Sequence, residues 1–185
     1  MTSRTRLSRT DWIAGALALC AEEGFNRVAV EPLAARLGTT KGSFYWHFGS
    51  RDELLQAMLE AWEREHTAGV ITDVEAREPA DRLRKLVRNA FGLSSADADG
   101  RTERAVLAAA DHRLVAPVVE RVRRARVGYL EELFAATGLP AARARARARV
   151  AYATYLGSLQ LGYPEPGAVT AEELIDEVVA VLGAP

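Results

Sequence analysis

Residues 43–48, SFYWHF, hold the side chains whose types and spacing come closest to catalytic chemistry. Ser43, Tyr45 and His47 offer a hydroxyl nucleophile, a phenol and an imidazole base. Side chains two residues apart on a helix point about 200° away from each other, so these three cannot form the hydrogen bonds that a catalytic group needs. The sequence also contains no phosphate-binding loop, dinucleotide fingerprint or paired-carboxylate motif. We therefore expect a protein that is not an enzyme.

The histidines and the cysteine do not suggest a metal site. His47, His66, His112 and the single Cys20 show no metal-ligand spacing. We expect no metal and no cofactor. One cysteine also excludes an internal disulfide and fits a reducing cytoplasm.

The same segment is better suited to holding an anion. Thr40, Lys41 and Ser43 supply hydrogen-bond donors at the start of a predicted helix, whose dipole favours phosphate. Tyr45 and Trp46 can donate from O–H and N–H to phosphates while their rings pack on sugars. The pattern favours nucleic acid as the partner.

Three further residues fit this interpretation. Gly42 in a helix costs about 1 kcal/mol against alanine, and its benefit could be close approach of the backbone to a partner. His47 can donate to phosphate as Tyr45 does. Arg51 lies in the first turn of the next predicted helix, where the dipole disfavours a cation, so a counter-anion would explain it.

The aromatic cluster divides into two faces. Phe44 and Phe48 lie about 40° apart around a helix, on the face that must enter the core. Trp46 then lies roughly opposite, with Tyr45 and His47 on either side. A buried position for Trp46 taken alone stays open, but an exposed tryptophan is uncommon unless it is used.

Bulk composition is that of an ordinary globular protein. The 185 residues suffice for one or two small domains with a core, at 49 % hydrophobic and 26 % charged residues. No run of about 18 uncharged apolar residues exists, so we expect no membrane span. The first residues, MTSRTRLSRTDW, lack the apolar segment of a secretion signal, and we expect a cytoplasmic location.

Charge is distributed unevenly along the chain. Residues 1–51 carry seven Lys and Arg against four Asp and Glu, although the whole chain has a net charge of −1. A mildly basic head on a slightly acidic body can suit a polyanion.

Periodicity predicts an all-α fold, because apolar residues recur at three- and four-residue spacing nearly throughout. Ser8 with Asp11, and Ser50 with Glu53, form capping-box patterns at two helix starts. The expected helices, about nine in total, span 9–23, 31–37, 41–47, 51 into the 70s, 79–94, 102–111, 114–137, 140–163 and 170–182. Residues 95–101 are expected to be a loop. The three short helices, with a glycine-containing turn before the third, match a helix-turn-helix.

The N-terminal motifs resemble the DNA-binding domain of the TetR family of bacterial transcriptional regulators. The resemblance covers about residues 8–60 and rests on AEEGF at 21–25, LAARLG at 33–38, KGSFYWHF at 41–48 and SRDELL at 50–55. It implies a DNA-binding domain at residues 1–51 and an effector-binding and dimerisation domain at 52–185.

The resemblance also implies roles for single residues. The helix from Lys41 would be the recognition helix in the major groove, with Lys41, Gly42 and Ser43 near bases and phosphates. Tyr45, Trp46 and His47 would hold the DNA backbone, and Thr40 and Arg51 would touch DNA beside them. Cys20 departs from the family's usual bulky aromatic. Glu31, followed by Pro32, places a negative charge where some members have a DNA-facing arginine, which removes one expected contact.

A single helix-turn-helix makes too few contacts for specific binding, so a dimer on half-sites about 34–36 Å apart is expected. The resemblance implies a homodimer through the last two helices, 140–163 and 170–182, that binds a palindromic double-stranded DNA operator. Ala151, Tyr155, Ser158 and Leu159 share one face of the first, with Gly157 permitting close approach. A purely intramolecular core for these helices stays open. Leu174, Val178, Val181 and Leu182 form a stripe on the last helix.

The body of the chain is expected to bind a small-molecule effector. Candidate residues are Trp62, His66, Phe91, His112, Tyr129, Phe134 and Tyr155. Residues of these types are more often core or surface than ligand-binding. The ARARARAR segment at 142–149 is expected to be solvated or paired with acids rather than a second nucleic-acid surface.

Together these features predict a ligand-responsive DNA-binding regulator, a repressor by family resemblance. The alternative is a helical adaptor that binds only protein. The exposed donors around Lys41 and Arg51 favour the anionic partner.

Overall fold

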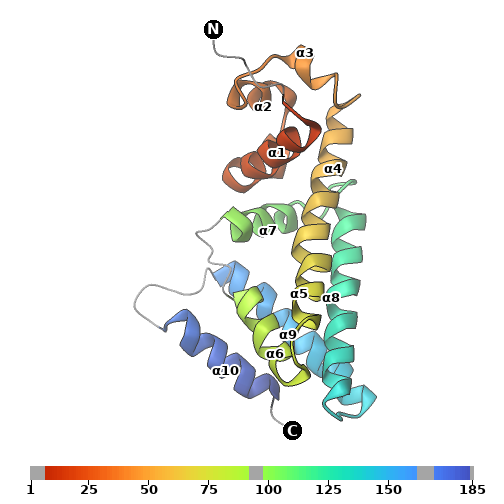
Figure 1. Ribbon diagram of the computed structural model, residues 1–185, viewed down its shortest axis with the longest axis vertical. Coiled ribbons are helices and arrows are strands. Elements are labelled where there is room, and N and C mark those ends of the chain that lie inside the picture. The colour runs from red at the N-terminus through yellow and green to blue at the C-terminus, as the bar shows by residue number, and fades with distance from the viewer. Residues whose placement is uncertain (1–6, 92–97, 162–168, 184–185) are drawn as a thin grey trace. The chain divides into compact units, whose positions relative to one another are not determined.

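The computed structural model describes residues 7–91, 98–161 and 169–183 (Figure 1). Within these ranges the chain is all-α, as predicted, with ten α-helices, one 3-10 turn and one π-helical turn, and no strand. The elements are α1 (Arg9–Glu23), η1 (Phe25–Arg27), α2 (Val30–Arg36), α3 (Lys41–Phe44), α4 (Arg51–Glu63), η2 (Arg64–Ala68), α5 (Gly69–Glu75), α6 (Pro79–Phe91), α7 (Ala98–Ala108), α8 (Ala116–Ala136), α9 (Ala141–Leu161) and α10 (Ala171–Gly183). Since α4, η2 and α5 follow without a break, that run counts as one helix and the described helices match the nine predicted.

Packing divides the chain into two compact units, each treated separately below. The first comprises Met1–Glu63 and Arg101–Val119, and the second comprises Arg64–Gly100 and Glu120–Pro185. The expected boundary between a DNA-binding domain at 1–51 and an effector-binding domain at 52–185 is a boundary of function, not of packing. It stays a prediction.

In the first unit, α1 begins and ends where the sequence predicts. The hydroxyl of Ser8 accepts from the backbone N–H of Asp11 at 3.2 Å, and the Asp11 carboxylate accepts from the backbone N–H of Ser8 at 2.7 Å. The predicted capping box is therefore present. At the other end Gly24 has a φ of 90°, which L-residues rarely adopt. Phe25 then turns back into the core, as expected, with 2 % of its surface exposed.

The same unit depends on a close approach at Gly15. α1 packs against α4 and α2, and α2 packs against α3, with Trp12 and Leu54 fully buried. A Cβ on Gly15 would lie 3.0 Å from Leu33 Cδ1 and 3.1 Å from Leu37 Cδ2. A larger residue at this position would have to displace both leucine side chains, so glycine favours the close approach of α1 and α2. Periodicity carries no signal for this contact, because Gly15 looks like one more small residue between apolar ones.

The third helix is shorter than predicted. The sequence predicts a helix over 41–47, but α3 ends at Phe44 and a tight turn follows. The N–H groups of His47 and Phe48 both donate to the carbonyl of Phe44, at 2.9 and 3.1 Å. The bond from His47 spans three residues, as in a 3-10 helix, and the bond from Phe48 spans four. Bonds that span three residues commonly tighten the last turn of a helix, here directly before Gly49. The side chains keep their predicted faces because the backbone still turns in the helical sense.

The segment before α7 corrects a second prediction. Residues 98–101, expected in a loop, form the first turn of α7, while 95–97 lie outside the described residues. Asp99 in that first turn favours a helix start through the helix dipole. The helix predicted to end at 111 ends at Ala108. The starts and ends of α2, α8 and α10 differ from prediction by one or two residues, and the predicted ends at 94 and 163 lie outside the described ranges.

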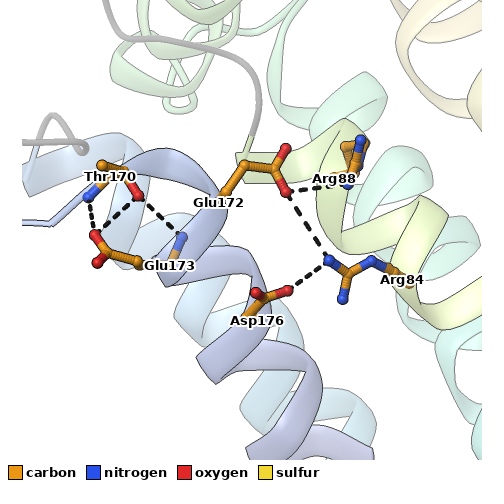
Figure 2. A network of polar contacts seen from close by, with 6 residues as sticks. All are labelled: Arg84, Arg88, Thr170, Glu172, Glu173 and Asp176. Carbon is orange, nitrogen blue, oxygen red and sulfur yellow. Dashed lines mark hydrogen bonds and ion pairs between the residues drawn. The ribbon is translucent and has the colours of Figure 1, made fainter.

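In the second unit, α6 packs against α5 and α10, and Figure 1 shows α10 alongside α6. Ile175, Val178 and Leu182 on α10 are buried. At the exposed edge, Arg84 of α6 pairs with Asp176 at 2.5 Å and Arg88 pairs with Glu172 at 3.0 Å (Figure 2). Apolar burial therefore holds α10 against the unit, and the exposed ion pairs join its outer edge to α6.

A capping box formed by Thr170 and Glu173, which was not among the predicted capping pairs, also precedes α10. The Glu173 carboxylate accepts from the N–H and the hydroxyl of Thr170, each at 2.8 Å, and the N–H of Glu173 donates to that hydroxyl at 3.2 Å (Figure 2). Thr170 is thus the residue at which the helix begins.

Most residues predicted to form the dimer seam are buried within the second unit itself. Ala151, Tyr155 and Leu159 of α9 are each less than 9 % exposed, as are Val178 and Leu182 of α10. These residues form intramolecular core. The large apolar side chains left exposed on the two helices are Val181, which belongs to the predicted stripe, and Val150 and Leu161, which the prediction did not include.

The alternating 142–149 segment is the first half of α9. Ala144 and Ala148 are buried and face the interior, whereas Ala142 and Ala146 are exposed, as are all the arginines except the partly buried Arg147. Arg147 donates to the backbone carbonyl of Leu182 at 3.1 Å, which satisfies a carbonyl at the end of α10. No helix in the described part of the chain is long and apolar enough to cross a membrane.

Candidate nucleic-acid interface and effector residues

The inward face of α3 is fixed by aromatic packing. Phe44 is fully buried and Phe48 is 1 % exposed, as predicted. Their rings stack with centroids 5.4 Å apart, and Trp12 of α1 meets Phe44 edge-on at 5.4 Å. These contacts set the rotation of α3 and leave the other face to solvent.

The outward face carries the residues predicted to bind DNA. Trp46 is 79 % exposed and Tyr45 is 54 % exposed, while His47 is half-buried. The Tyr45 ring lies edge-on to Phe44 at 5.2 Å, so the phenol is held by the core while its hydroxyl end stays accessible. The predicted outward orientation of these side chains is present. Their contact with DNA stays a prediction.

The turn before α3 is capped as expected. The Thr40 hydroxyl accepts from the N–H of Ser43 at 3.3 Å. A Cβ added to Gly42 would meet only the Thr40 hydroxyl oxygen, at an ordinary 3.7 Å. No contact among residues 7–91, 98–161 and 169–183 therefore requires glycine at this position, which agrees with a need imposed by a partner.

Lys41 is already paired with a carboxylate. Its ammonium lies 2.5 Å from Glu31, in the first turn of α2, and both side chains are more than half exposed. Their hydrogen bond raises the pKa of Lys41 and lowers the pKa of Glu31, so both groups are charged at neutral pH. Glu31, considered from the sequence only as a lost contact, is thus part of the surface around α3.

Arg51 is also engaged within the chain. Its Nε donates to the carbonyl of Val28 at 2.6 Å, and its Nη2 donates to the carbonyl of Asn26 at 3.3 Å. The half-buried guanidinium ties the start of α4 to the turn before α2. No sequence pattern indicates this role, because the partners are backbone groups 23 and 25 residues away.

Arg9 and Glu53 contact the residues that follow α3. The Arg9 guanidinium lies 4.5 Å from the Phe48 ring centroid and pairs with Glu53 at 3.3 Å. Glu53 also accepts from the N–H of Gly49 at 2.7 Å, while its own N–H donates to the Ser50 hydroxyl at 3.2 Å. The expected Ser50–Glu53 cap is therefore present, with its carboxylate directed to Gly49.

Two predicted effector residues lie in the first unit and are well packed. Trp62 is fully buried and donates from Nε1 to the buried Glu103 carboxylate at 3.0 Å. His112 packs edge-on against Phe25 at 5.0 Å, and its Nδ1 accepts from the N–H of Leu114 at 3.2 Å. Both residues therefore have structural contacts.

Arg126 links two predicted effector residues in the second unit. Its Nε donates to the buried Thr67 hydroxyl at 3.1 Å, and its Nη2 donates to the carbonyl of His66 at 3.1 Å. Its Nη1 lies 3.4 Å from the Tyr155 hydroxyl, with the guanidinium 5.5 Å from that ring's centroid. His66 and Thr67 belong to the π-helical turn η2, and such turns often occur at functional sites.

The other candidates in this unit are mostly apolar core. Phe91 and Phe134 are buried, and His66 Nε2 lies 4.0 Å from Asp99. The Tyr129 hydroxyl is buried without a hydrogen-bond partner among the described residues, and burial raises its pKa. A buried unpaired hydroxyl is a group that a polar ligand atom could satisfy.

Within the described ranges, no three His, Cys, Asp or Glu side chains group to hold a metal ion. Burial raises the pKa of Cys20 to about 12, so its thiol stays neutral and unreactive.

Comparison with known proteins agrees with the geometry of α3. Residues 13–58 match the family described as bacterial regulatory proteins, tetR family. The probable HTH-type transcriptional regulator ArpR of Pseudomonas putida is 30 % identical over 79 residues, which is 42 % of this chain and 38 % of that protein. The similarity to this relative thus spans well under half of its length.

Similarity of fold extends along nearly the whole chain. A transcriptional regulator from Rhodococcus sp. Rha1 has a TM-score of 0.77 at 20 % identity, covering 96 % of this chain and 95 % of that one. The structure of AibR in complex with isovaleryl coenzyme A and operator DNA has a TM-score of 0.66 at 21 % identity, covering 94 % and 96 %.

Proposed function

We propose that this chain is a ligand-responsive repressor of the TetR family of bacterial transcriptional regulators, a DNA-binding regulator rather than an enzyme. In this proposal a homodimer binds a palindromic operator and is released by a small-molecule effector. The residues that contact DNA are Thr40, Lys41, Gly42, Ser43, Tyr45, Trp46, His47 and Arg51.

The observation that carries the proposal is the exposure of Trp46. With 79 % of its surface in solvent, this indole lies in the turn directly after α3, exposed where Phe44 is buried. A large exposed aromatic is costly for a soluble protein unless a partner covers it. Gly42 and Lys41 lie in α3 and Thr40 caps it, and no contact within the described part of the chain requires glycine at position 42.

A dimer is supported by the outer surface of α9. Val150 and Leu161 are 56 % and 69 % exposed, and eleven residues are about three helical turns, so they share one face. Gly157 lies on that face, and a Cβ there would meet no atom of the described residues within 4 Å. A second helix could therefore approach closely at Gly157, with Val181 of α10 adding apolar surface.

The effector is proposed to bind in the 52–185 domain. The residues proposed to contact it are Trp62, His66, Phe91, His112, Tyr129, Phe134 and Tyr155. AibR, of similar fold, was solved with isovaleryl coenzyme A, so acyl coenzyme A thioesters are the first compounds to screen for release of bound DNA.

Selection of bound sequences from random double-stranded DNA tests the central function. We expect an enriched inverted repeat whose half-site centres lie about 34–36 Å apart or a multiple of that. Recovery of no enriched sequence would contradict DNA recognition and favour the protein-binding adaptor. Enrichment without dyad symmetry would contradict the dimer.

A further inference from the structure

We propose that Glu31 and Lys41 act as one unit that reads a G·C base pair in the major groove, which makes Glu31 a determinant of operator sequence. This inference rests on the proposed DNA binding through α3. It assigns a positive role to the carboxylate that the sequence alone marks as a lost contact.

The first step is the position of the pair. Lys41 is the first residue of α3 and Glu31 lies in the first turn of α2, with Nζ and Oε1 2.5 Å apart. The Glu31 side chain is 66 % exposed and the Lys41 side chain 53 % exposed. Tyr45, another residue proposed to contact DNA, lies four residues beyond Lys41 and is 54 % exposed. The carboxylate is thus on the surface that carries the proposed DNA contacts.

The second step is that stability does not explain the pair. Exposed ion pairs contribute little to folding, because water and salt screen them. A carboxylate on a surface that meets phosphates is unfavourable for binding unless it accepts a hydrogen bond there. In DNA, the groups that donate in the major groove are the amino groups of cytosine and adenine.

The third step is complementarity. The pair presents donors beside an acceptor, since Lys41 has three N–H groups and the Glu31 carboxylate, which accepts from Lys41 and from its own backbone N–H, has about four lone-pair sites. The major-groove edge of a G·C pair presents the acceptors N7 and O6 of guanine beside the N4 amino group of cytosine. Lys41 can therefore donate to guanine while Glu31 accepts from the cytosine of the same base pair. In a T·A pair the thymine methyl replaces the N7 acceptor and opposes Lys41.

The test compares sequence selection by the wild type with that by Glu31→Ala and Glu31→Gln. Glu22→Ala is the matched control, because Glu22 forms an exposed bidentate ion pair with Arg36 in the same unit, at 2.5 and 2.6 Å. Thermal unfolding of each variant checks that it is folded. The probes are random double-stranded DNA and the wild-type consensus with one base pair changed at a time.

We expect the wild type to prefer G·C by about tenfold or more at one position in each half-site. Glu31→Ala should lose this preference at that position alone, and Glu22→Ala should keep it. Glu31→Gln should shift the preference toward A·T, because a carboxamide pairs with the N6 and N7 of adenine.

Three results would overturn the inference. One is an unchanged consensus for Glu31→Ala, with tighter binding to all DNA and a salt slope steeper by about 1, which would mean that Glu31 only screens Lys41. Another is the same loss of preference in Glu22→Ala. The third is a wild-type consensus without a fixed G·C position. Failure of the wild type to enrich any sequence is a separate result, which would overturn the proposed function as well.

Discussion

Arg51 Nε donates a hydrogen bond to the backbone carbonyl of Val28 at 2.6 Å. A second bond from Nη2 reaches the carbonyl of Asn26 at 3.3 Å. The guanidinium that is proposed to contact phosphate thus also joins α4 to the turn before α2. This one side chain thus contributes to the stability of the fold and is proposed to contribute to DNA binding. The two contributions can be measured separately.

Arg51→Ala should affect both properties. Loss of two charge-assisted hydrogen bonds should lower the free energy of unfolding by about 1–3 kcal/mol in urea titrations. Loss of a phosphate contact should also weaken binding to all sequences and lower the slope of log affinity against log salt by about 1. An unchanged slope beside a loss of stability would restrict Arg51 to its structural role.

Gly42→Ala should raise the stability of the protein while it lowers the affinity for the operator. Alanine has room at this site and is the better helix former, so the free energy of unfolding should rise by about 0.5–1 kcal/mol. The added methyl group lies on the face proposed to approach DNA, so operator affinity should fall. Retained affinity in a binding titration would contradict close approach at Gly42.

Gly15→Ala is the matched control for this substitution. The new Cβ would lie 3.0 and 3.1 Å from two leucine methyl groups, so alanine here should overpack the α1–α2 contact. We expect a loss of about 1–3 kcal/mol in unfolding free energy. Greater stability in this variant would contradict the close packing described for the first unit.

Leu161→Glu should disrupt the proposed dimer. A charge on this exposed apolar face would be desolvated in the interface but not in the monomer. Light scattering should therefore report a monomer, with little change in unfolding temperature at low protein concentration. Gln160→Glu adds the same charge at an exposed neighbouring position and should remain dimeric. If light scattering gave the same molecular mass for Leu161→Glu and Gln160→Glu, the dimer interface would not include Leu161.

The stability of the first unit should fall as the pH is lowered below about 5. Hydrogen bonds hold the pKa of the Asp11, Glu22, Glu31 and Glu53 carboxyl groups below their usual values. The unfolded chain therefore binds more protons in acid, so these contributions are present above about pH 5 and are lost as pH falls through the lowered values. Asp11→Asn should make the decline of the urea midpoint between about pH 5 and pH 2 shallower. A midpoint independent of pH in that range would contradict these pairings.

Much of the DNA-binding surface could be predicted because its signals are local. Helical periodicity assigns Phe44 and Phe48 to the core and turns Trp46 outward, and the side chains lie so, with α3 itself shorter. Capping residues such as Ser8 are recognised from three-residue spacing. These features depend only on neighbours within one or two turns.

Features that depend on contacts distant in sequence could not be predicted. The Arg51 bonds to backbone carbonyls, the closeness of Gly15 to Leu33 and the Arg126 contact with Tyr155 each join different elements. The predicted dimer seam shows the same limit. An apolar stripe such as Ala151–Tyr155 satisfies an intramolecular core as well as an interface, and in this chain it is buried.

The most direct test of the two-face assignment of α3 is Trp46→Ala, measured for operator affinity and for unfolding free energy. Phe44→Ala, on the opposite face, provides the reference and should lose about 3–5 kcal/mol of stability. For Trp46→Ala we expect a change in stability within about 0.5 kcal/mol and a loss of affinity of about tenfold, equivalent to one charge-assisted hydrogen bond. Unchanged operator affinity in this variant, or a loss of stability like that of Phe44→Ala, would contradict the account.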